Sequence, residues 1–172
     1  MIVKCVYKYE EKIRKMFGIP RLYIFSILLG LAWSCTDGWV KHGNFCFLFS
    51  HNKVHWAEAA EICRSFDSFL AEPVSHDIDS FIVAKTRVTS PKRIYWLGGS
   101  DLQEEGTFVW TSLGQPLSYT NWIPGDPNNA NAGEDCVIAN WLGDGRWADA
   151  ECEWVEYYIC QKESDDETTI IG

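Results

Sequence analysis

Residues 121–152 read NWIPGDPNNANAGEDCVIANWLGDGRWADAEC, an acidic and amide-rich segment that holds two cysteines. It overlaps a longer stretch, 114–133, that is rich in proline, asparagine and glycine and has almost no periodicity. Such a composition predicts a long loop region, and long ordered loops in compact domains usually carry a function. The apolar run 136–141 predicts a strand that closes the loop.

Carboxylates and side-chain amides are concentrated in and around this loop. Asp101 and Glu105 follow a predicted strand, and the other members of the cluster are Asp126, Asn128, Asn129, Glu134, Asp135 and Asp149. Calcium takes about six to eight oxygen ligands from carboxylates, amides, backbone carbonyls and water. The cluster therefore indicates a calcium site. Solvated loop carboxylates that bind nothing are the alternative, and composition alone favours it.

Around the loop, hydrophobic periodicity predicts two helices and several strands. Apolar residues recur at helical spacing over 54–66 and over 77–88, where Ser75 is a suitable N-cap. The aromatic, alternating segment 38–49 predicts a β-hairpin with its turn at Gly43–Asn44. Further strands are expected at 93–99, 107–111, 136–141 and 157–160. This order of elements indicates a mixed α+β domain of two helices and antiparallel strands.

The apolar run 22–33 has the length of a signal-peptide hydrophobic region and is shorter than the about 20 residues that a transmembrane helix needs. Basic residues precede it, and small residues suit a cut before Cys35. We expect residues 1–34 to be a signal peptide and the mature protein to be secreted, without stable membrane insertion. A retained membrane anchor is the alternative. Either Met1 or Met16 can be the true start, because the basic segment is long.

Removal of that segment would leave a strongly acidic protein. The full chain has a net charge of −9, and nine basic and twenty-two acidic residues would remain after the cut, which gives −13. This charge argues against a nucleic-acid partner, because phosphates select lysine and arginine. It fits cation binding or a solvated secreted surface. Residues 163–172 are polar and acidic, and we expect them to form a disordered tail.

Seven cysteines occur, and Cys5 lies in the segment expected to be removed. An even number then remains behind a signal peptide, which predicts a disulfide framework. No CxxC pair is present, which argues against a structural zinc site. Spacing alone leaves the pairing open. The six cysteines are Cys35, Cys46, Cys63, Cys136, Cys152 and Cys160.

Residues 35–162 resemble the C-type lectin domain at successive landmarks. These are GWVKHGNFCFLF, WAEAAEIC, FLAEPVSHDIDSFI, YWLGGSD, NWIPGDPNNANAGEDCV, GRWADAEC and YYIC. Several spaced motifs in one order make the match specific. The resemblance implies a C-type lectin-like fold with a long calcium-binding loop region and three disulfides. The implied pairs are Cys35–Cys46, Cys63–Cys160 and Cys136–Cys152.

In this family a sugar places two vicinal hydroxyls on a calcium ion, and the calcium ligands also hydrogen-bond those hydroxyls. The primary calcium and carbohydrate site implied by the resemblance consists of Asp126, Asn128, Glu134 and Asp149, with a cis bond before Pro127. Two departures predict a weakened site. Asp126 is one methylene shorter than the usual Glu or Gln, and Ala148 replaces an asparagine that normally contacts both the ion and the sugar.

The family's auxiliary calcium site, which stiffens the loop without touching sugar, maps onto Asp101, Glu105, Asn129, Glu134 and Asp135. Asn128 is the third residue of the triplet Asp126-Pro127-Asn128, and an asparagine there resembles the class that prefers mannose, glucose or fucose. Trp122 and Trp141 could stack on a sugar, but we expect both to belong to the core.

These features predict calcium-dependent carbohydrate binding, with Ca²⁺ as cofactor and mannose-type glycans as partners. The resemblance places such a protein in innate immunity or cell-surface glycan recognition. A homo-oligomer is expected, because weak single-site affinity usually needs multivalency. We do not expect an enzyme, because the four histidines lie away from the carboxylates and no GxSxG or HExxH motif occurs. The rival function is protein, mineral or ice recognition without sugar binding, since fold does not fix function.

Overall fold

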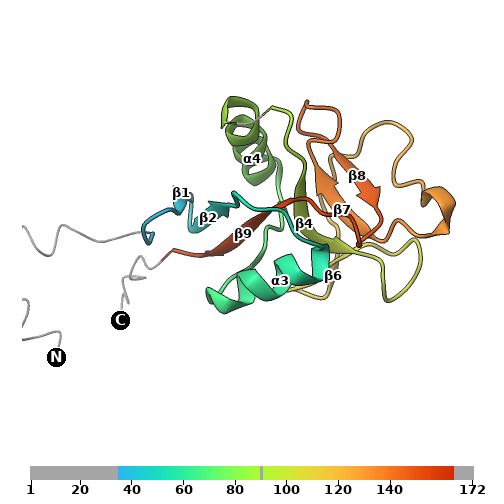
Figure 1. Ribbon diagram of the computed structural model, residues 1–172, viewed down its shortest axis with the longest axis horizontal. Helices are drawn as coiled ribbons and strands as arrows, with labels where there is room; N and C mark the ends of the chain where they lie inside the picture. The colour runs from blue at the N-terminus through green and yellow to red at the C-terminus, as the bar shows by residue number, and fades with distance from the viewer. Residues whose placement is uncertain (1–34, 90, 165–172) are drawn as a thin grey trace, which may run out of the picture. The chain divides into compact units, whose positions relative to one another are not determined.

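The computed structural model describes residues 35–89 and 91–164 (Figure 1). The expected signal peptide, 1–34, lies outside the described residues, as do residues 165–172 of the expected tail. Within the described part, no helix has the length and apolar character needed to cross a membrane.

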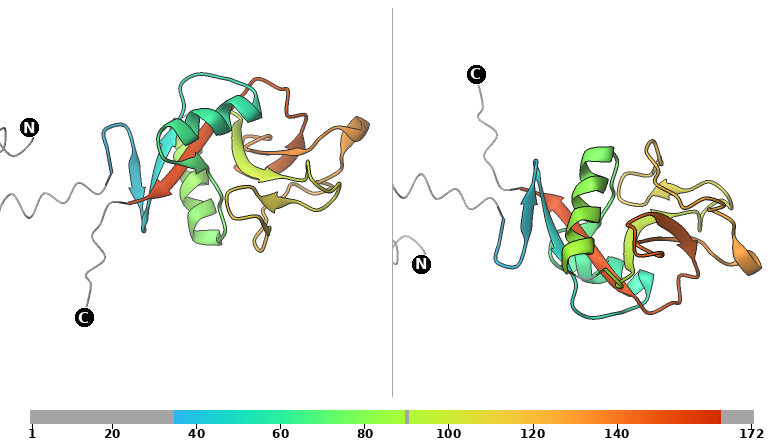
Figure 2. Two further views of the ribbon diagram at one scale, coloured as in Figure 1. Left: turned by 90° about the horizontal axis from the view of Figure 1, so that it is seen from below. Right: turned by 90° about the horizontal axis from the view of Figure 1, so that it is seen from above.

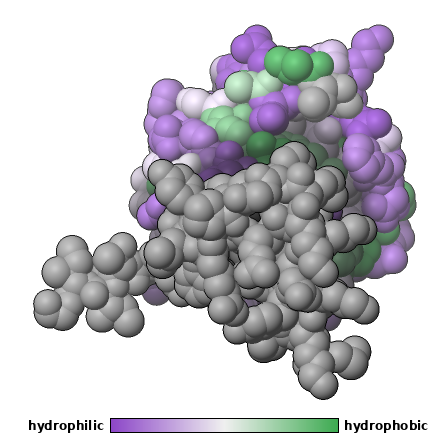
Figure 3. Space-filling model, turned by 90° about the vertical axis from the view of Figure 1, so that its left-hand side faces the viewer, coloured by the Kyte–Doolittle hydropathy of each residue, from purple (hydrophilic) through white to green (hydrophobic). Residues whose placement is uncertain are grey.

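The first hairpin and the last strand of the domain lie side by side. Strands β1 (Val40–His42) and β2 (Phe45–Phe49) form the predicted hairpin, and β2 pairs antiparallel with β9 (Tyr157–Glu163). Strand β9 is longer than predicted, because Glu163 still pairs with Phe45. In the view of Figure 3, the coloured surface of the domain is mainly hydrophilic, with scattered hydrophobic residues.

The two predicted helices are present and lie on opposite sides of the central strands (Figures 1 and 2). They are α3 (Trp56–Ser65) and α4 (His76–Thr89). Between them, β4 (Tyr95–Ser100) pairs parallel with β9. The expectation of antiparallel strands is therefore wrong for this one pair. Periodicity shows which face of a strand is apolar but carries no information on the direction of its partner.

The central strands bury both of their faces, so each helix covers a separate core. Along β4, Tyr95 and Leu97 pack into a core with Ile78 and Ile82 of α4. The intervening residue, Trp96, packs into a second core, which contains Ala59 and Cys63 of α3. This alternation follows from the two-residue period of a strand. All six residues of β4 are buried, which explains why its sequence contains no charged residue.

Strands β5 to β8 build the half of the domain that contains the long loop region. Sequence patterns predicted β5 (Val109–Trp110) and β7 (Cys136–Ala139) but missed three short strands. These are β3 (Phe69–Leu70), β6 (Gln115–Pro116) and β8 (Trp147–Ala150). The loop between β6 and β7 also contains a 3-10 turn, η1 (Ala130–Ala132). Strands β3 and β6 have two residues each and lie in no longer alternating segment, so they show no pattern of their own.

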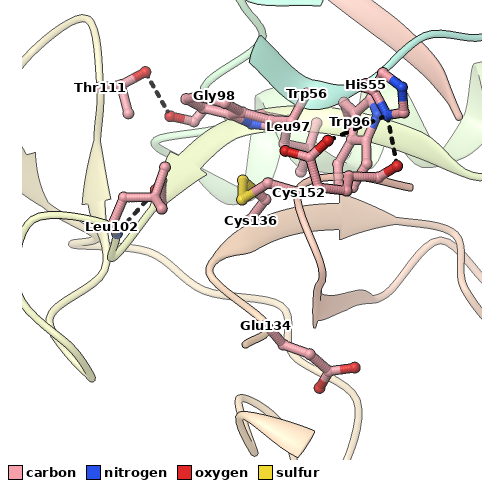
Figure 4. The surroundings of a disulfide bond; sticks show 12 residues. His55, Trp56, Trp96, Leu97, Gly98, Leu102, Thr111, Glu134, Cys136 and Cys152 are labelled. Carbon is pink, nitrogen blue, oxygen red and sulfur yellow. Dashed lines mark hydrogen bonds and ion pairs between the residues drawn. A yellow bond between two sulfur atoms is a disulfide. The ribbon is translucent and has the colours of Figure 1, made fainter. Parts of the chain in front are cut away.

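The three disulfides pair as the resemblance implied: Cys35–Cys46, Cys63–Cys160 and Cys136–Cys152. Cys63–Cys160 joins α3 to β9 across 97 residues of sequence, and cross-links of this kind typically contribute about 2–4 kcal/mol. Cys136–Cys152 ties the start of β7 to the chain just after β8. Figure 4 shows this bridge beside Trp56 and Trp96, so it is part of the second core.

A buried carboxylate, Glu72, connects β3 to the residues that follow β5. Its two oxygens accept hydrogen bonds from the Ser112 backbone N–H at 2.7 Å and the Ser112 hydroxyl at 2.8 Å. Burial raises the pKa of Glu72 above its ordinary value of 4.5, and the bonds from Ser112 oppose this only in part. The folded state therefore holds the Glu72 proton more tightly than the unfolded state does.

From this follows a pH-dependent stability difference for Glu72→Gln. Because the folded-state pKa is raised, the contribution of Glu72 is most favourable below pH 4.5 and is lost as the pH rises through the folded-state pKa. Glutamine cannot ionise and still offers an oxygen to Ser112. We expect the variant to gain stability relative to wild type between pH 4.5 and 7, measured by urea denaturation in EDTA. A difference that stays constant with pH would contradict this.

Candidate functional site

Strand β8 carries Asp149 and is held in place from three directions. It pairs antiparallel with β7, with Val137 opposite Asp149 and Ile138 opposite Ala148. Its first residue, Trp147, donates its backbone N–H to Asn121 O and accepts from Ile123 N, both at 2.8 Å. The Cys136–Cys152 bridge closes its far end. The sequence thus places Asp149 on a buried strand beside the start of the acidic loop.

Asp149 holds the acidic loop against β8 through one of its two oxygens. Asp149 Oδ2 accepts from the backbone N–H groups of Asn128 at 2.8 Å and Asn129 at 2.6 Å. The other oxygen, Oδ1, is buried and accepts no hydrogen bond from any described residue. A buried acceptor without a partner is costly, so this oxygen is a natural ligand atom for a cation.

The four residues of the predicted primary site line one pocket of about 210 Å³. Asn128 donates its side-chain amide to Asp126 Oδ1, and the Asp126–Pro127 peptide bond is cis, as the resemblance implied. Glu134 Oε2 accepts from Ala130 N at 2.9 Å, and Figure 4 shows its side chain well apart from the disulfide. The loop therefore brings the shorter Asp126 carboxylate to the same pocket as Asn128, Glu134 and Asp149.

Electrostatic repulsion in this pocket favours a bound cation. Burial raises the pKa of Glu134, its bond from Ala130 lowers it, and the nearby carboxylates of Asp149, Asp126 and Glu151 raise it further. Several carboxylates that repel one another are stabilised when a divalent ion is placed among them.

A second group of carboxylates lies where β4 ends and the loop returns to β7. Three side chains, those of Asp101, Glu105 and Asp135, each offer one carboxylate oxygen. These three oxygens lie within 4.8 Å of one another. Asp101 Oδ2 accepts from Gly106 N at 2.8 Å, whereas its Oδ1 is buried and without a partner among the described residues. Burial, with smaller contributions from Glu105 and Asp135, raises the pKa of Asp101.

This group contains three of the five residues predicted for the auxiliary calcium site. The other two, Asn129 and Glu134, bond to the neighbouring loop. Asn129 Oδ1 accepts from Glu134 N at 3.1 Å, and the Glu134 carboxylate lines the primary pocket. The membership of Asn129 and Glu134 in the auxiliary site stays a prediction.

The two tryptophans considered for sugar stacking have different environments. Trp122 packs against the first core, as expected, with its ring 5.8 Å from that of Trp147. Trp141 is 42% exposed and lines the primary pocket, so its assignment to the core is wrong. It lies in the loop between β7 and β8, where its ring pairs with that of Trp154. Burial of an aromatic residue in a loop cannot be judged from its type alone.

The loop is also anchored to helix α4 through Asp79. Asp79 Oδ1 accepts from Trp147 Nε1 at 2.9 Å, and Oδ2 accepts from Asn121 Nδ2 at 2.8 Å and Tyr119 Oη at 3.1 Å. Burial raises the pKa of Asp79 and these bonds oppose the rise. Burial of Tyr119, together with the nearby negative charge of Asp79 and the hydrogen bond to it, raises the pKa of Tyr119 to about 12. Sequence reasoning missed this role, since Asp79 occurs within an ordinary amphipathic pattern.

Comparison with known proteins identifies the family. The sequence model of the family described as the lectin C-type domain matches residues 52–162. The chain belongs to the C-type lectin domain family. It is 38% identical over 130 residues to perlucin of Haliotis laevigata, a match that covers 75% of this chain and 83% of perlucin.

Solved C-type lectin-like structures share the fold. The cow carbohydrate-recognition domain of CD23, crystallised in the presence of a GlcNAc2Man3 oligosaccharide, superposes with a TM-score of 0.67 at 32% identity. That match covers 75% of this chain and 95% of the CD23 domain. A calcium-independent type II antifreeze protein matches with the same TM-score at 28% identity, over 76% of this chain and 95% of that protein. The shared fold therefore also occurs in a protein that does not depend on calcium.

The residues of both acidic groups fit a calcium ion. C-type lectin domains generally bind calcium, although calcium-independent relatives exist. Each group here supplies oxygen ligands, which calcium prefers, and each includes one buried aspartate oxygen, on Asp149 or Asp101, without a described partner. Asp126, Asn128, Glu134 and Asp149 would hold the primary ion, and Asp101, Glu105 and Asp135 the auxiliary one.

Proposed function

We propose that this chain is a calcium-dependent lectin that binds mannose-type glycans through the pocket of Asp126, Asn128, Glu134 and Asp149. The observation that carries the proposal is the convergence of these four side chains on one pocket, where Asp149 Oδ1 is buried and has no partner among the described residues. Bound calcium would accept lone pairs from two vicinal sugar hydroxyls. The carboxylates beside it would accept the hydroxyl protons in hydrogen bonds.

Asn128 is the residue that relates this pocket to mannose, glucose and fucose. Its exposed side chain can present an amide N–H to a sugar oxygen while Asp126 accepts the other amide hydrogen. The backbone N–H of Asn128 is already bonded to Asp149, so the loop fixes the position of the side chain. An amide in this place and an acid at Asp126 follow the order of the mannose-binding class.

Asn128→Ala tests the proposal, because it removes the side-chain amide and keeps the backbone bond to Asp149. We expect wild type, expressed as the full chain through a secretory pathway, to be retained on mannose resin in calcium and released by EDTA. Galactose resin should retain it less. The variant should bind mannose at least about tenfold more weakly, because it loses both one charge-assisted hydrogen bond and one of the residues that would hold the calcium ion.

Gln103→Ala provides the control, because Gln103 is an exposed amide outside the pocket. Its retention should equal that of wild type. Retention of the Asn128→Ala protein at the wild-type level, or retention of wild type that survives EDTA, would contradict the proposal.

Recognition of a protein, mineral or ice surface is the second candidate, and Ala148 is the observation that favours it. Its methyl group lines the pocket where an asparagine would contact both ion and sugar. This function predicts folded protein that neither sugar resin retains. The chain's likeness to perlucin and to antifreeze proteins is compatible with such a role.

We further propose that the protein is secreted after removal of residues 1–34 and acts in innate immunity or cell-surface glycan recognition. Its three disulfides support an oxidising compartment. Oligomerisation would raise weak single-site affinity through multivalency. The family is in general one of binding domains and not of enzymes.

A further inference from the structure

Basic residues are concentrated in the second half of α4 and in the segment that leads from it into β4. Residues 80–100 contain no acidic residue, although the whole chain has 24 acidic and 15 basic residues. The same stretch contains four basic residues: Lys85, Arg87, Lys92 and Arg93. Short segments rich in lysine and arginine are typical of surfaces that bind heparin or other polyanions.

The buried side chain of Asn140 fixes the second part of this segment. Asn140 Nδ2 donates to Pro91 O at 3.2 Å and to Arg93 O at 2.8 Å. Its Oδ1 accepts from Gly145 N at 2.9 Å. Asn140 follows β7 directly, so these bonds join residues 91–93 to the β7–β8 loop, residues 140–146.

Helix α4 borders the same loop. Gly145 lies so close to Val83 that a Cβ on the glycine would be 2.5 Å from a Val83 methyl carbon. Arg87 follows Val83 by one helical turn, and residues four apart lie on the same face of a helix. A Cβ on Gly143 would likewise be 3.1 Å from Pro91 O. Both parts of the basic segment therefore lie beside the β7–β8 loop.

Three of the four cations have no carboxylate partner within the part of the chain that the structure describes. These are Arg87 and Lys92, which are exposed, and Arg93, which is half-buried. The nearby acidic residue of the β7–β8 loop, Asp144, is already bonded to Arg146 of that loop at 2.7 Å. The result is a locally positive surface on an acidic protein.

Lys53 extends this surface across the ring of Tyr157. The Arg93 guanidinium lies 4.4 Å from the ring centre of Tyr157, and Lys53 Nζ lies 5.1 Å from the same centre. Lys53 also pairs with Glu156 at 2.7 Å, but the Glu156 side chain is only 15% exposed, whereas that of Lys53 is 43% exposed. An approaching anion therefore meets the cation more than the carboxylate.

We propose that Lys53, Arg87, Lys92 and Arg93, the basic surface, bind a sulfated polysaccharide independently of calcium. A linear polyanion can contact several exposed cations at once, and the release of its counterions favours binding. Charges more than about 8 Å away are largely screened at physiological ionic strength, so the acidic loops do not cancel this attraction.

The compartment favours this polyanion over nucleic acid. The three disulfides support an oxidising environment, and sulfated polysaccharides are the polyanions of cell surfaces and extracellular matrices. The inference thus relies on the proposed secretion, but it does not depend on sugar binding at the primary pocket.

Heparin is the probe, and EDTA removes any contribution of calcium. A chain of net charge −9 should flow through a negatively charged heparin column unless a local surface holds it. We expect the wild-type full chain to be retained at about 50 mM NaCl and released at higher salt.

The double variant Arg87→Gln/Lys92→Gln should bind heparin at least about tenfold more weakly by surface plasmon resonance. Its plot of log affinity against log salt should be shallower by about one unit or more, because fewer counterions are released. Arg93 is left in place, since its side chain packs on Tyr157.

The control is Lys41→Gln/Arg64→Gln, which removes the same charge from exposed positions in β1 and α3. It should keep the affinity and salt slope of wild type, and heparin stripped of its sulfate groups should not bind. Flow-through of folded wild type, or equal weakening in both double variants, would overturn the basic surface as the site.

Two further measurements separate this inference from its alternatives. Mannose retention in calcium should be the same in wild type and in both double variants, so its absence in wild type would contradict the proposed function and leave heparin binding in EDTA intact. If phosphatidylserine vesicles bound through Arg87 and Lys92 while heparin did not, the partner would be a membrane and the assignment to a polysaccharide would be wrong.

Discussion

Replacement of Asp149 by asparagine is expected to abolish calcium-dependent sugar retention while leaving the fold intact. Asp149 Oδ2 holds the loop by accepting from the backbone N–H groups of Asn128 and Asn129, and an asparagine oxygen can accept the same two bonds. What the variant loses is the negative charge and the free oxygen Oδ1. Calcium affinity depends strongly on ligand charge, so we expect a fall of about two orders of magnitude in calcium affinity.

The measurement is calcium titration followed by intrinsic tryptophan fluorescence, with mannose-resin retention as a second readout. Asp144→Asn is the matched control, because Asp144 lies in the β7–β8 loop, pairs with Arg146 and does not line the pocket. It should bind calcium as wild type does. If Asp149→Asn kept wild-type calcium affinity, the ion would have to bind elsewhere and the proposed primary site would be wrong.

The sequence predicted the elements whose patterns are long enough to be periodic. Helices α3 and α4 and the β1–β2 hairpin contain apolar residues at clear spacing, whereas β4 was visible as a longer buried run that begins with Tyr95, Trp96 and Leu97. Strand β8 was missed, although it carries Asp149, because its four residues are all buried and so show no alternation. Its position depends on pairing with β7 and on bonds from Asn121 and Ile123, and such long-range contacts leave no local signal.

The candidate site was predictable in its polar half and not in its apolar half. Motif order identified Asp126, Asn128 and Glu134 as neighbours in one loop. It could not show that Trp141 faces the same pocket, nor that Trp154 pairs with it from beyond the second cysteine of the bridge. Trp141 and Trp154 are thirteen residues apart in the sequence, and their ring contact at 5.5 Å forms only in the folded chain. The spacing of the two cysteines was visible, but the direction of the loop side chains was not.

Asp79→Ala should destabilise the protein by about 3–5 kcal/mol, although Asp79 lies outside the pocket. Burial alone disfavours this carboxylate, as its raised pKa indicates, and bonds from Trp147, Asn121 and Tyr119 oppose that cost. Removing Asp79 leaves their donors without an acceptor. The indole of Trp147 is fully buried, so its N–H cannot turn to water. Each buried unsatisfied donor costs about 1–3 kcal/mol, and the three losses together exceed the gain from removing a buried charge.

The same change should weaken calcium binding, because Trp147 begins β8 and Asn121 begins the acidic loop. Urea denaturation in EDTA measures the stability loss separately from any calcium effect, and a titration under native conditions then measures calcium affinity. Asp77→Ala is the matched control, since Asp77 lies on the same helix, its side chain is 79% exposed, and it pairs with His42. An exposed pair of this kind contributes less than about 1 kcal/mol. If both variants lost equal stability, the bonds from α4 to the loop would not support the site. A large loss confined to Asp79→Ala would instead show that helix α4 positions the calcium-binding loop.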